Sequence, residues 1–291
     1  MTRRRKLEEH RQNLGEIRGI MNSMKTLAYI ETRKIARFLD SQQAMVASIE
    51  AMAADFISFF PETLPTDEGE NAVYLLVGSE RGFCGNFNES LLPAMESCIT
   101  ESHDIHNNKQ PMMVAIGHKL HTTLESDSRL VASIDGANVV EEIEAVLARI
   151  TQTLLTLQAT YPTLSLFVLY HGGGQANQQG IDEQQVLMQK LLSPFQRYQD
   201  KKPDYSHAPL LNVAPADFLL ELTDHYLFAA LHEILYTSLM AENHRRVQHL
   251  DGAVQHLDEK EAELFSQCNA LRQEEIIEEI EVILLSAESL M

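Results

Sequence analysis

The sequence predicts an α/β protein in which two long terminal helices form an antiparallel coiled coil, and the region between them in the sequence forms a central domain with a mostly parallel β-sheet. Three observations lead to this prediction. Apolar residues recur every 3.5 positions through the first sixty residues. No proline follows Pro215, and the rest of the chain is rich in good helix formers. Between these segments, short apolar runs alternate with helical stretches, which is typical of βαβ units.

The first helix is predicted over about residues 4–59, because an unbroken heptad spacing ends only at Pro61, the first proline of the chain. All the spaced positions except Glu31 and Gln42 are apolar, and they are Leu14, Ile17, Met21, Met24, Ala28, Glu31, Ile35, Phe38, Gln42, Met45, Ile49, Met52, Phe56 and Phe59. Such a helix would be roughly 80 Å long at about 1.5 Å per residue. It is too long for a compact domain and needs a partner of similar length.

That partner is predicted from about Ala216 to Met291. Its heptad positions are Val247, Leu250, Val254, Leu257, Glu261, Leu264, Cys268 and Leu271, followed after a shift of one residue by Ile276, Ile280, Ile283, Ala287 and Leu290. Gly252 interrupts the helix at a cost of about 1 kcal/mol relative to alanine, which packing can offset. We expect the two helices to pair antiparallel, with the tip of the longer one beyond the pair.

The central region has the alternating strand and helix pattern of a Rossmann-like α/β domain. Buried strands are predicted at 72–77, 112–116 and 164–170, helical stretches near 88–103 and 139–160, and an edge strand at 184–192. Residues 171–183 and 199–208 are predicted to be loops. The chain therefore divides into an N-terminal coiled-coil helix (1–60), a central α/β domain (70–214) and a C-terminal coiled-coil helix (215–291).

The net charge of −19 argues against nucleic-acid binding, which requires clustered positive charge. The charge is uneven, because residues 1–40 carry a balance of +5 and the last 34 residues a balance of −8. Three cysteines without a CxxC pair fit a reducing compartment and argue against a disulfide scaffold. No apolar run approaches the roughly 20 residues of a membrane span, so any membrane association would come through partners.

The loop after the first predicted strand, Gly78 to Asn88, is rich in glycine and invites a phosphate-binding interpretation. Its glycines fit neither GxGxxG nor GxxxxGK[ST], so a tight structural turn is the simpler interpretation. The histidines form no metal-ligand set with neighbouring carboxylates or cysteines. His232-Glu233 begins like HExxH, but Tyr236 stands where the second histidine is required.

The same loop resembles the signature Ser-Asp-Arg-Gly-Leu-Cys-Gly-Gly-x-Asn of F-type ATP synthase γ (gamma) subunits, with Glu80, Phe83 and Asn86 as departures. Further similar segments follow in the family's order along the chain, and they are Ser23–Ala28, Leu191–Pro194, Ala214-Pro215, Ala241–His244 and Cys268–Gln273. The small-residue segments near 252–256 and 285–287 differ from the family pattern, and the tip is unusually acidic. These departures resemble a divergent bacterial form, such as a sodium-translocating N-type ATPase.

The resemblance implies a non-catalytic rotor shaft of a proton- or sodium-translocating ATP synthase. It implies an α3β3 head, an ε subunit and a ring of c subunits as partners, no cofactor, and a place on the cytoplasmic face of the bacterial inner membrane. In such a complex, rotation of the c ring turns the shaft, whose uneven face changes the nucleotide affinity of the catalytic β subunits.

The resemblance also implies three groups of subunit contacts. Arg272 and Gln273 would meet a loop of β near the top of the shaft. Met24 and Lys25 would pass the acidic lever of β, as would Arg33, Lys34 and Arg37. Arg81 would lie where the signature loop meets the coil.

Two other functions fit parts of the sequence. A nucleotide- or phosphate-binding enzyme is supported only by Gly82 and Gly85, and it predicts ligand binding by the isolated chain. A coiled-coil scaffold or adaptor predicts a stable dimer of the chain with itself, whereas a shaft subunit would behave poorly until other subunits surround it.

Overall fold

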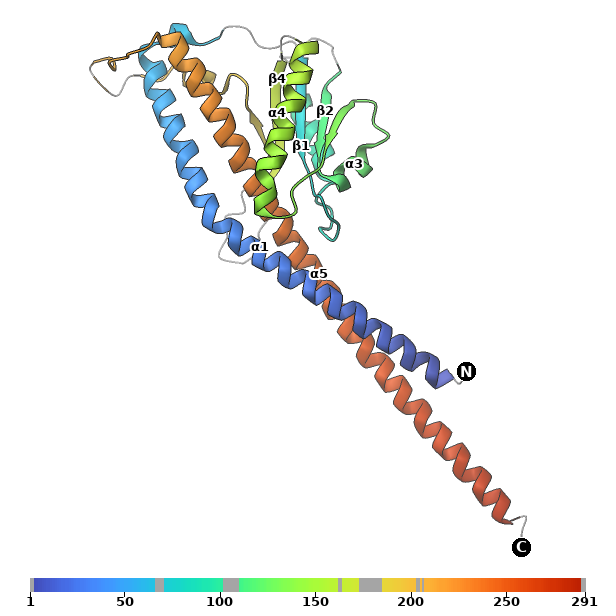
Figure 1. Cartoon of the computed structure of the whole chain (residues 1–291). Coiled ribbons are helices and arrows are strands. Elements are labelled where there is room, and N and C mark those ends of the chain that lie inside the picture. The colour runs from blue at the N-terminus through green and yellow to red at the C-terminus, as the bar shows by residue number, and fades with distance from the viewer. Residues whose placement is uncertain are drawn as a thin grey trace. The chain divides into compact units, whose positions relative to one another are not determined.

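The computed structural model describes residues 3–65, 71–101, 110–161, 164–172, 185–202, 205 and 207–288. Its helices are α1 (Arg3–Phe59), α2 (Leu91–Glu101), α3 (His118–Leu124), α4 (Ile143–Thr160) and α5 (Pro215–Glu288), with short 3-10 turns at Pro61–Thr63, Val140–Glu142 and Pro194–Tyr198. Its strands are β1 (Asn71–Val77), β2 (Met112–Ile116), β3 (Leu130–Ile134), β4 (Leu164–Gly172) and β5 (Gln185–Lys190) (Figure 1). The long helices predicted at 4–59 and from 216 onward are confirmed.

The chain forms two compact units. The helical unit consists of Met1–Tyr29 and Arg246–Met291, and the sheet unit consists of Ile30–Arg245. Both α1 and α5 contribute residues to each unit. The division into 1–60, 70–214 and 215–291 stays a prediction.

The sheet unit contains a five-stranded sheet in the order β3-β2-β1-β4-β5. β1 pairs in parallel with β2 and β4, β2 pairs in parallel with β3, and β5 is an antiparallel edge strand on β4. The predicted mostly parallel sheet and the edge strand predicted at 184–192 are therefore confirmed, with Gln184 outside the described residues.

Both faces of this sheet are buried, which explains why the strands are apolar without interruption. Val73, Leu75 and Val77 belong to a hydrophobic cluster that includes residues of α1, α4 and α5. The alternate residues Tyr74 and Leu76 belong to a second cluster, with residues of α2 and α3. The sheet is thus a layer between two sets of helices, of which one contains the terminal helices.

The buried stripe of α1 within the sheet unit differs from the predicted one. The positions predicted at Phe38, Met45 and Met52 are 47%, 46% and 49% exposed. The stripe instead passes through Thr32, Val46 and Ala53, together with the correctly predicted Ile35 and Ile49. Because apolar residues occupy adjacent positions in this part of α1, spacing alone could not decide which of each pair faces the core.

In the helical unit, α1 and α5 run antiparallel. Ion pairs join Lys25 to Asp251 at 2.9 Å, Arg18 to Asp258, and Arg4 to Glu275 at 2.8 Å, so residue numbers rise on one helix as they fall on the other. Exposed ion pairs contribute at most about 1 kcal/mol each. The apolar seam therefore provides most of the stability of the pair.

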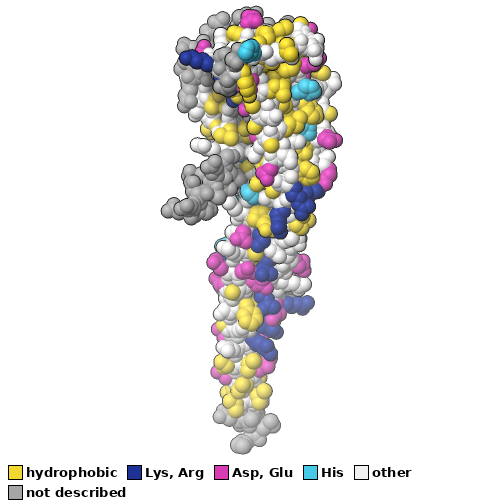
Figure 2. Space-filling view, turned by 90° about the vertical axis from the view of Figure 1, so that its left-hand side faces the viewer, with side chains coloured by type: hydrophobic (Ala, Val, Ile, Leu, Met, Phe, Trp, Pro, Cys, Tyr) yellow, Lys and Arg dark blue, Asp and Glu magenta, His cyan; other side chains and the backbone are white. Residues whose placement is uncertain are grey.

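The seam of α5 follows the predicted heptad positions as far as Leu271, with Leu250, Val254 and Cys268 buried. The large apolar residues that follow Glu275 are 46–66% exposed, as expected for a tip that extends beyond the helical pair. Figure 2 shows hydrophobic side chains gathered near this end of α5. Arg4 is already the partner of Glu275, so α1 has few residues left to cover the tip.

Two elements were missed by the sequence analysis. Helix α3 has only seven residues, which is too short for a clear apolar periodicity. Strand β3 has one buried residue, Ile134, and therefore lacks the apolar run that marks a buried strand. In addition, His171 and Gly172, which were predicted to be in a loop, extend β4, while the rest of the predicted loop at 173–183 lies outside the described residues.

Gly117, at the end of β2, has a backbone φ of +105°, and a Cβ there would lie 2.6 Å from the carbonyl oxygen of Ser79. We predict that Gly117→Ala lowers the free energy of unfolding by about 2–4 kcal/mol, from backbone strain and overpacking. Urea denaturation measures this change. Gly82→Ala is the matched control, because its nearest neighbour would be 3.9 Å away, and an equal loss in both variants would contradict the prediction.

Candidate functional site: the loop after β1 and the surfaces of α1 and α5

The loop after β1 is closed by a side-chain amide. The backbone N–H of Ser79 donates to Oδ1 of Asn88 at 2.8 Å, and Nδ2 of Asn88 donates to the Ser79 hydroxyl oxygen at 2.9 Å. Gly78 permits this approach, because a Cβ there would lie 2.7 Å from Oδ1 of Asn88. The first and last residues of the signature segment therefore hold each other in place.

Glu80 connects this loop to two other strand ends. One carboxylate oxygen accepts hydrogen bonds from the backbone N–H groups of His118, at 2.9 Å, and Gly136, at 2.7 Å. His118 follows β2 and Gly136 follows β3, so a single side chain bridges three connections at the carboxyl edge of the sheet. Hydrogen bonds of backbone N–H groups to a charged acceptor are stronger than those to a neutral one.

His171, near the end of β4, is stacked under the loop. Its ring centroid lies 3.9 Å from that of Phe87, and its Nε2 donates to the Phe87 carbonyl oxygen at 2.7 Å. Only 3% of the residue is exposed, and burial lowers the pKa of the imidazole. The Nδ1 atom is buried and has no hydrogen-bond partner among the described residues. The neutral ring thus serves as a packing and hydrogen-bonding support for the loop.

These contacts occupy the place where open parallel sheets usually bind ligands. In such sheets the ligand crevice lies at the carboxyl ends of the strands, where the strand order reverses. Here that point lies between β1 and β4, and the loop residue Phe87 is packed there against His171. The chain's own loop therefore takes up space that a nucleotide would need.

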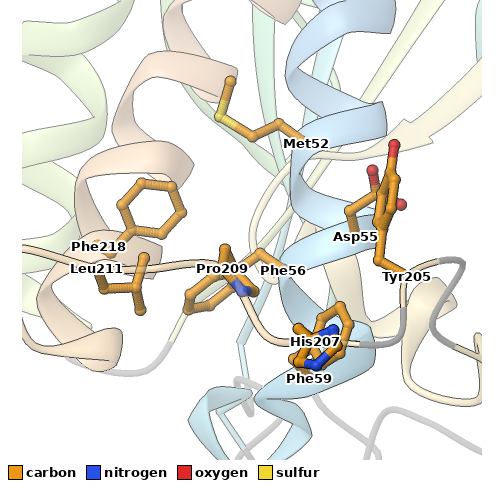
Figure 3. A pocket seen from close by; sticks show the side chains of 9 residues that line it. All are labelled: Met52, Asp55, Phe56, Phe59, Tyr205, His207, Pro209, Leu211 and Phe218. Atoms are coloured by element: carbon orange, nitrogen blue, oxygen red, sulfur yellow. The ribbon is translucent and has the colours of Figure 1, made fainter.

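A cavity of about 300 Å³ lies between the end of α1 and the beginning of α5 (Figure 3). Its walls are mainly apolar, and they include Phe56, Phe59 and Phe218. Its one carboxylate, Asp55, is paired with Lys201 at 3.2 Å. Tyr205 and His207 complete the polar part of the lining.

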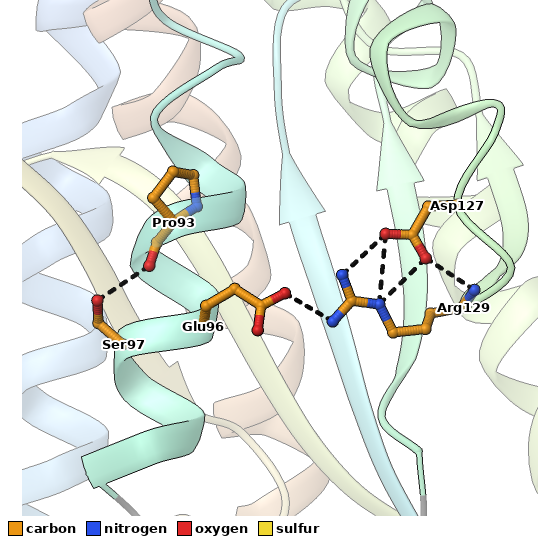
Figure 4. A network of polar contacts seen from close by, with 5 residues as sticks. All are labelled: Pro93, Glu96, Ser97, Asp127 and Arg129. Carbon is orange, nitrogen blue, oxygen red and sulfur yellow. Dashed lines mark hydrogen bonds and ion pairs between the residues drawn. The ribbon is translucent and has the colours of Figure 1, made fainter.

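The polar network around Arg129 joins two parts of the sheet unit (Figure 4). Arg129 donates to Glu96 of α2 at 2.7 Å and forms a paired contact with Asp127, with one distance of 2.8 Å. Hydrogen bonds from Arg129 lower the pKa of the Asp127 carboxyl. The network ties α2 to the segment before β3, and none of its residues lines the cavity between α1 and α5.

Four of the predicted contact residues lie in the helical unit. Met24 is half-buried, and Lys25 is engaged with Asp251. Arg272 and Gln273 are exposed on α5. Lys25 lies opposite Asp251 of α5. Arg272 and Gln273 are therefore about 30 Å further along α5 than the level of Lys25, at about 1.5 Å per residue. The structure thus places these residues in two groups at different levels of the helical pair.

The other two predicted contact residues, Arg33 of α1 and Arg81 of the loop after β1, are exposed in the sheet unit. Nearby, Lys34 forms ion pairs with Glu141 at 2.5 Å and Glu31 at 3.7 Å, which raise the pKa of its ammonium group. The sequence analysis did not identify Glu80 or His171 as site residues. Glu80 could have been identified from its position within the signature segment. For His171, the only indication in the sequence was its position at the end of a predicted strand.

The histidine, cysteine and acidic side chains of the described residues form no cluster of three or more that could hold a metal ion. The described helices contain no segment with the length and apolar character that crossing a membrane requires.

Comparisons with known proteins agree over almost the whole chain. A family model described as ATP synthase matches residues 3–290. A curated protein named ATP synthase gamma chain from Clostridium botulinum (strain Langeland) is 24% identical over 283 residues, which are 96% of this chain and 95% of the relative. The ATP synthase gamma chain of Geotalea daltonii is 25% identical over 222 residues, which are 75% of this chain and 73% of the relative.

Solved structures with a similar fold include a chain of the Euglena gracilis mitochondrial ATP synthase, OSCP/F1/c-ring, with a TM-score of 0.64 and 14% identity over 99% of this chain and 94% of the other. A chain of the Tetrahymena thermophila mitochondrial ATP synthase central stalk and c-ring has a TM-score of 0.54 and 14% identity, over 80% of this chain and 99% of the other. At this identity, the likeness shows the fold.

We predict that Glu80→Ala lowers the free energy of unfolding by about 1–3 kcal/mol, because two backbone N–H groups lose a charged acceptor. Glu80→Gln, which retains an oxygen acceptor, is expected to lose less. Urea denaturation gives the stabilities, and hydrogen exchange at the amides of His118 and Gly136 reports the local loss. Glu89→Ala is the control, since Glu89 is exposed in the same loop. Unchanged exchange at both amides in Glu80→Ala would refute the bridge.

From the burial of His171 we predict that the free energy of unfolding decreases as the pH is lowered. Burial places its pKa in the folded protein below the ordinary value of 6.5, so the unfolded chain binds the proton first as the pH drops. Stability is therefore retained above about pH 6.5 and lost below it. We expect the wild type to lose more stability between pH 7 and pH 5 than His171→Gln, which keeps an N–H donor but does not titrate. Urea denaturation at the two pH values measures the free energy of unfolding. If the wild type and His171→Gln lost equal amounts of it, this role of His171 would be excluded.

Proposed function

The chain belongs to the ATP synthase family, and from this membership we propose that it is the γ subunit, the central rotor shaft, of a bacterial ATP synthase. The observation that carries the proposal is the match of the family model over residues 3–290. The full-length similarity to gamma chains supports it, as does the antiparallel pairing of α1 and α5. The partners are an α3β3 head, an ε subunit and the c ring, and ion flow through the membrane sector drives the rotation.

We further propose that the chain carries no catalytic site of its own. Its crevice at the carboxyl edge of the sheet is packed with its own loop, and the carboxylate in the cavity beside α1 is paired with Lys201. In this role the chain acts mechanically. Two long helices with an apolar seam resist twisting, and an uneven surface can present different faces to the three catalytic β subunits as it turns.

The exposed tip of α5 supports insertion of the shaft into a head. Ile276, Ile277 and Ile280 are 46–56% exposed, which is costly for a helix that stays in water. A sleeve formed by other subunits would cover them. We place the assembled protein on the cytoplasmic face of the bacterial plasma membrane, attached through its partners.

We propose the six predicted residues as subunit contacts. Arg272 and Gln273 would donate to a loop of β, and both are exposed on α5. Met24, Lys25 and Arg33 would face the moving part of β, while Arg81 would lie at the collar. Lys25 would act through its remaining N–H donors, because Asp251 already accepts one hydrogen bond from it.

The test is co-expression with α and β subunits from the same source. We expect a complex of three α, three β and one copy of this chain with ATPase activity. Changing Arg272 and Gln273 together to alanine should lower that activity about tenfold, the effect of roughly 1.4 kcal/mol, which is at the lower end for hydrogen bonds to charged groups. Sizing and an ATPase assay measure both.

Lys260→Ala is the matched control, because Lys260 is exposed on the same helix and pairs only locally with Glu263. It should leave the activity unchanged. If the chain does not bind the α and β subunits and forms a stable dimer with itself, the proposal of a rotor shaft is refuted and that of an adaptor is favoured.

A further inference from the structure

An apolar groove separates α4 from α5 on one face of the sheet. Its volume is about 610 Å³, and its lining residues come from Leu147 to Gln158 of α4, from Leu220 to Leu231 of α5, and from β1 and β4. Three of the large apolar side chains on its walls are mostly exposed, namely Leu155 at 56%, Leu220 at 64% and Phe228 at 56%. Exposed apolar side chains gathered in one hollow are typical of interaction sites.

The charge in the lining of this groove is negative. Asp224 is the only charged residue in its lining. Helix α5 has no lysine or arginine between Pro215 and Asn243, but it does have Glu221 and Glu233. The one cation of α4, Arg149, donates to the carbonyl oxygen of Asp135 at 2.9 Å. An occupant of the groove would therefore gain from positive charge.

The shape of the groove favours a helix over a small molecule. Each wall spans eleven steps along a helix, or about 17 Å at 1.5 Å per residue. Leu220 and Phe228 are two turns apart on α5, and a small ligand that fills the centre would leave one of them uncovered. An amphipathic helix laid along the groove would cover both, together with Leu155, through apolar residues spaced by three and four positions.

We propose that the groove between α4 and α5 binds a basic amphipathic helix of a partner protein. The apolar face of that helix covers Leu220, Phe228 and Leu155, and a lysine or arginine at its flank pairs with Asp224. This inference depends on the groove alone and stands whether or not the chain acts as a rotor shaft.

The test uses the full chain and two labelled 14-residue helical peptides, one with leucines on one face and lysines beside them, and one with glutamates in place of the lysines. Fluorescence anisotropy measures their affinities. We expect the lysine peptide to bind at least tenfold more tightly than the glutamate peptide. Asp224→Lys should weaken the lysine peptide about tenfold and strengthen the glutamate peptide. Phe228→Ala should weaken the lysine peptide as well.

Glu125→Lys is the matched control, because Glu125 is exposed beside α3, on the other face of the sheet. It should change neither affinity, and circular dichroism shows that each variant is folded. Equal binding of the two peptides, or no effect of Asp224→Lys, would overturn the proposal in favour of unspecific apolar contact. Nile red that binds in the groove and is not displaced by the lysine peptide would overturn it in favour of a small-molecule site.

Discussion

The structure depends on the need of a parallel sheet to have both faces covered. α2 and α3 cover one face, while α4 and parts of α1 and α5 cover the other. Ile35, Ile49 and Ile57 of α1 are fully or nearly fully buried by this arrangement. The terminal helices are therefore not appendages of the sheet unit. The same two helices that pair through a heptad seam in the helical unit complete the core of the sheet unit.

The loop after β1 fills the edge of the sheet with contacts of the chain's own residues. A carboxylate, that of Glu80, accepts the N–H groups of His118 and Gly136 at the ends of two strands. Backbone N–H groups at such strand ends are what a phosphate would otherwise use. The Glu80 carboxylate takes that place here, and Phe87 packs on His171, so the chain's own groups occupy the carboxyl edge of the sheet.

The sequence predicted the long helices and the parallel sheet well, because periodicity over many residues and runs of buried strand residues are strong local signals. It failed where two apolar residues are adjacent, as at Met45-Val46, since only packing decides which of them is buried. It also missed β3, whose Val131 is 44% exposed and whose pattern is weak. Glu80 and His171 could not be assigned their contacts, because those contacts join residues 38 to 84 positions apart.

The exposed apolar surfaces and the acidic charge of α5 belong together. From Ile276 to Leu285 the helix exposes isoleucine, leucine and valine side chains, and no lysine or arginine follows Gln273. Glutamates between these residues give this end of the helix a negative charge. They also repel other acidic surfaces, including a second copy of the same tip. The charge thus opposes self-association of a helix whose apolar residues need a cover, and that cover must come from a different protein.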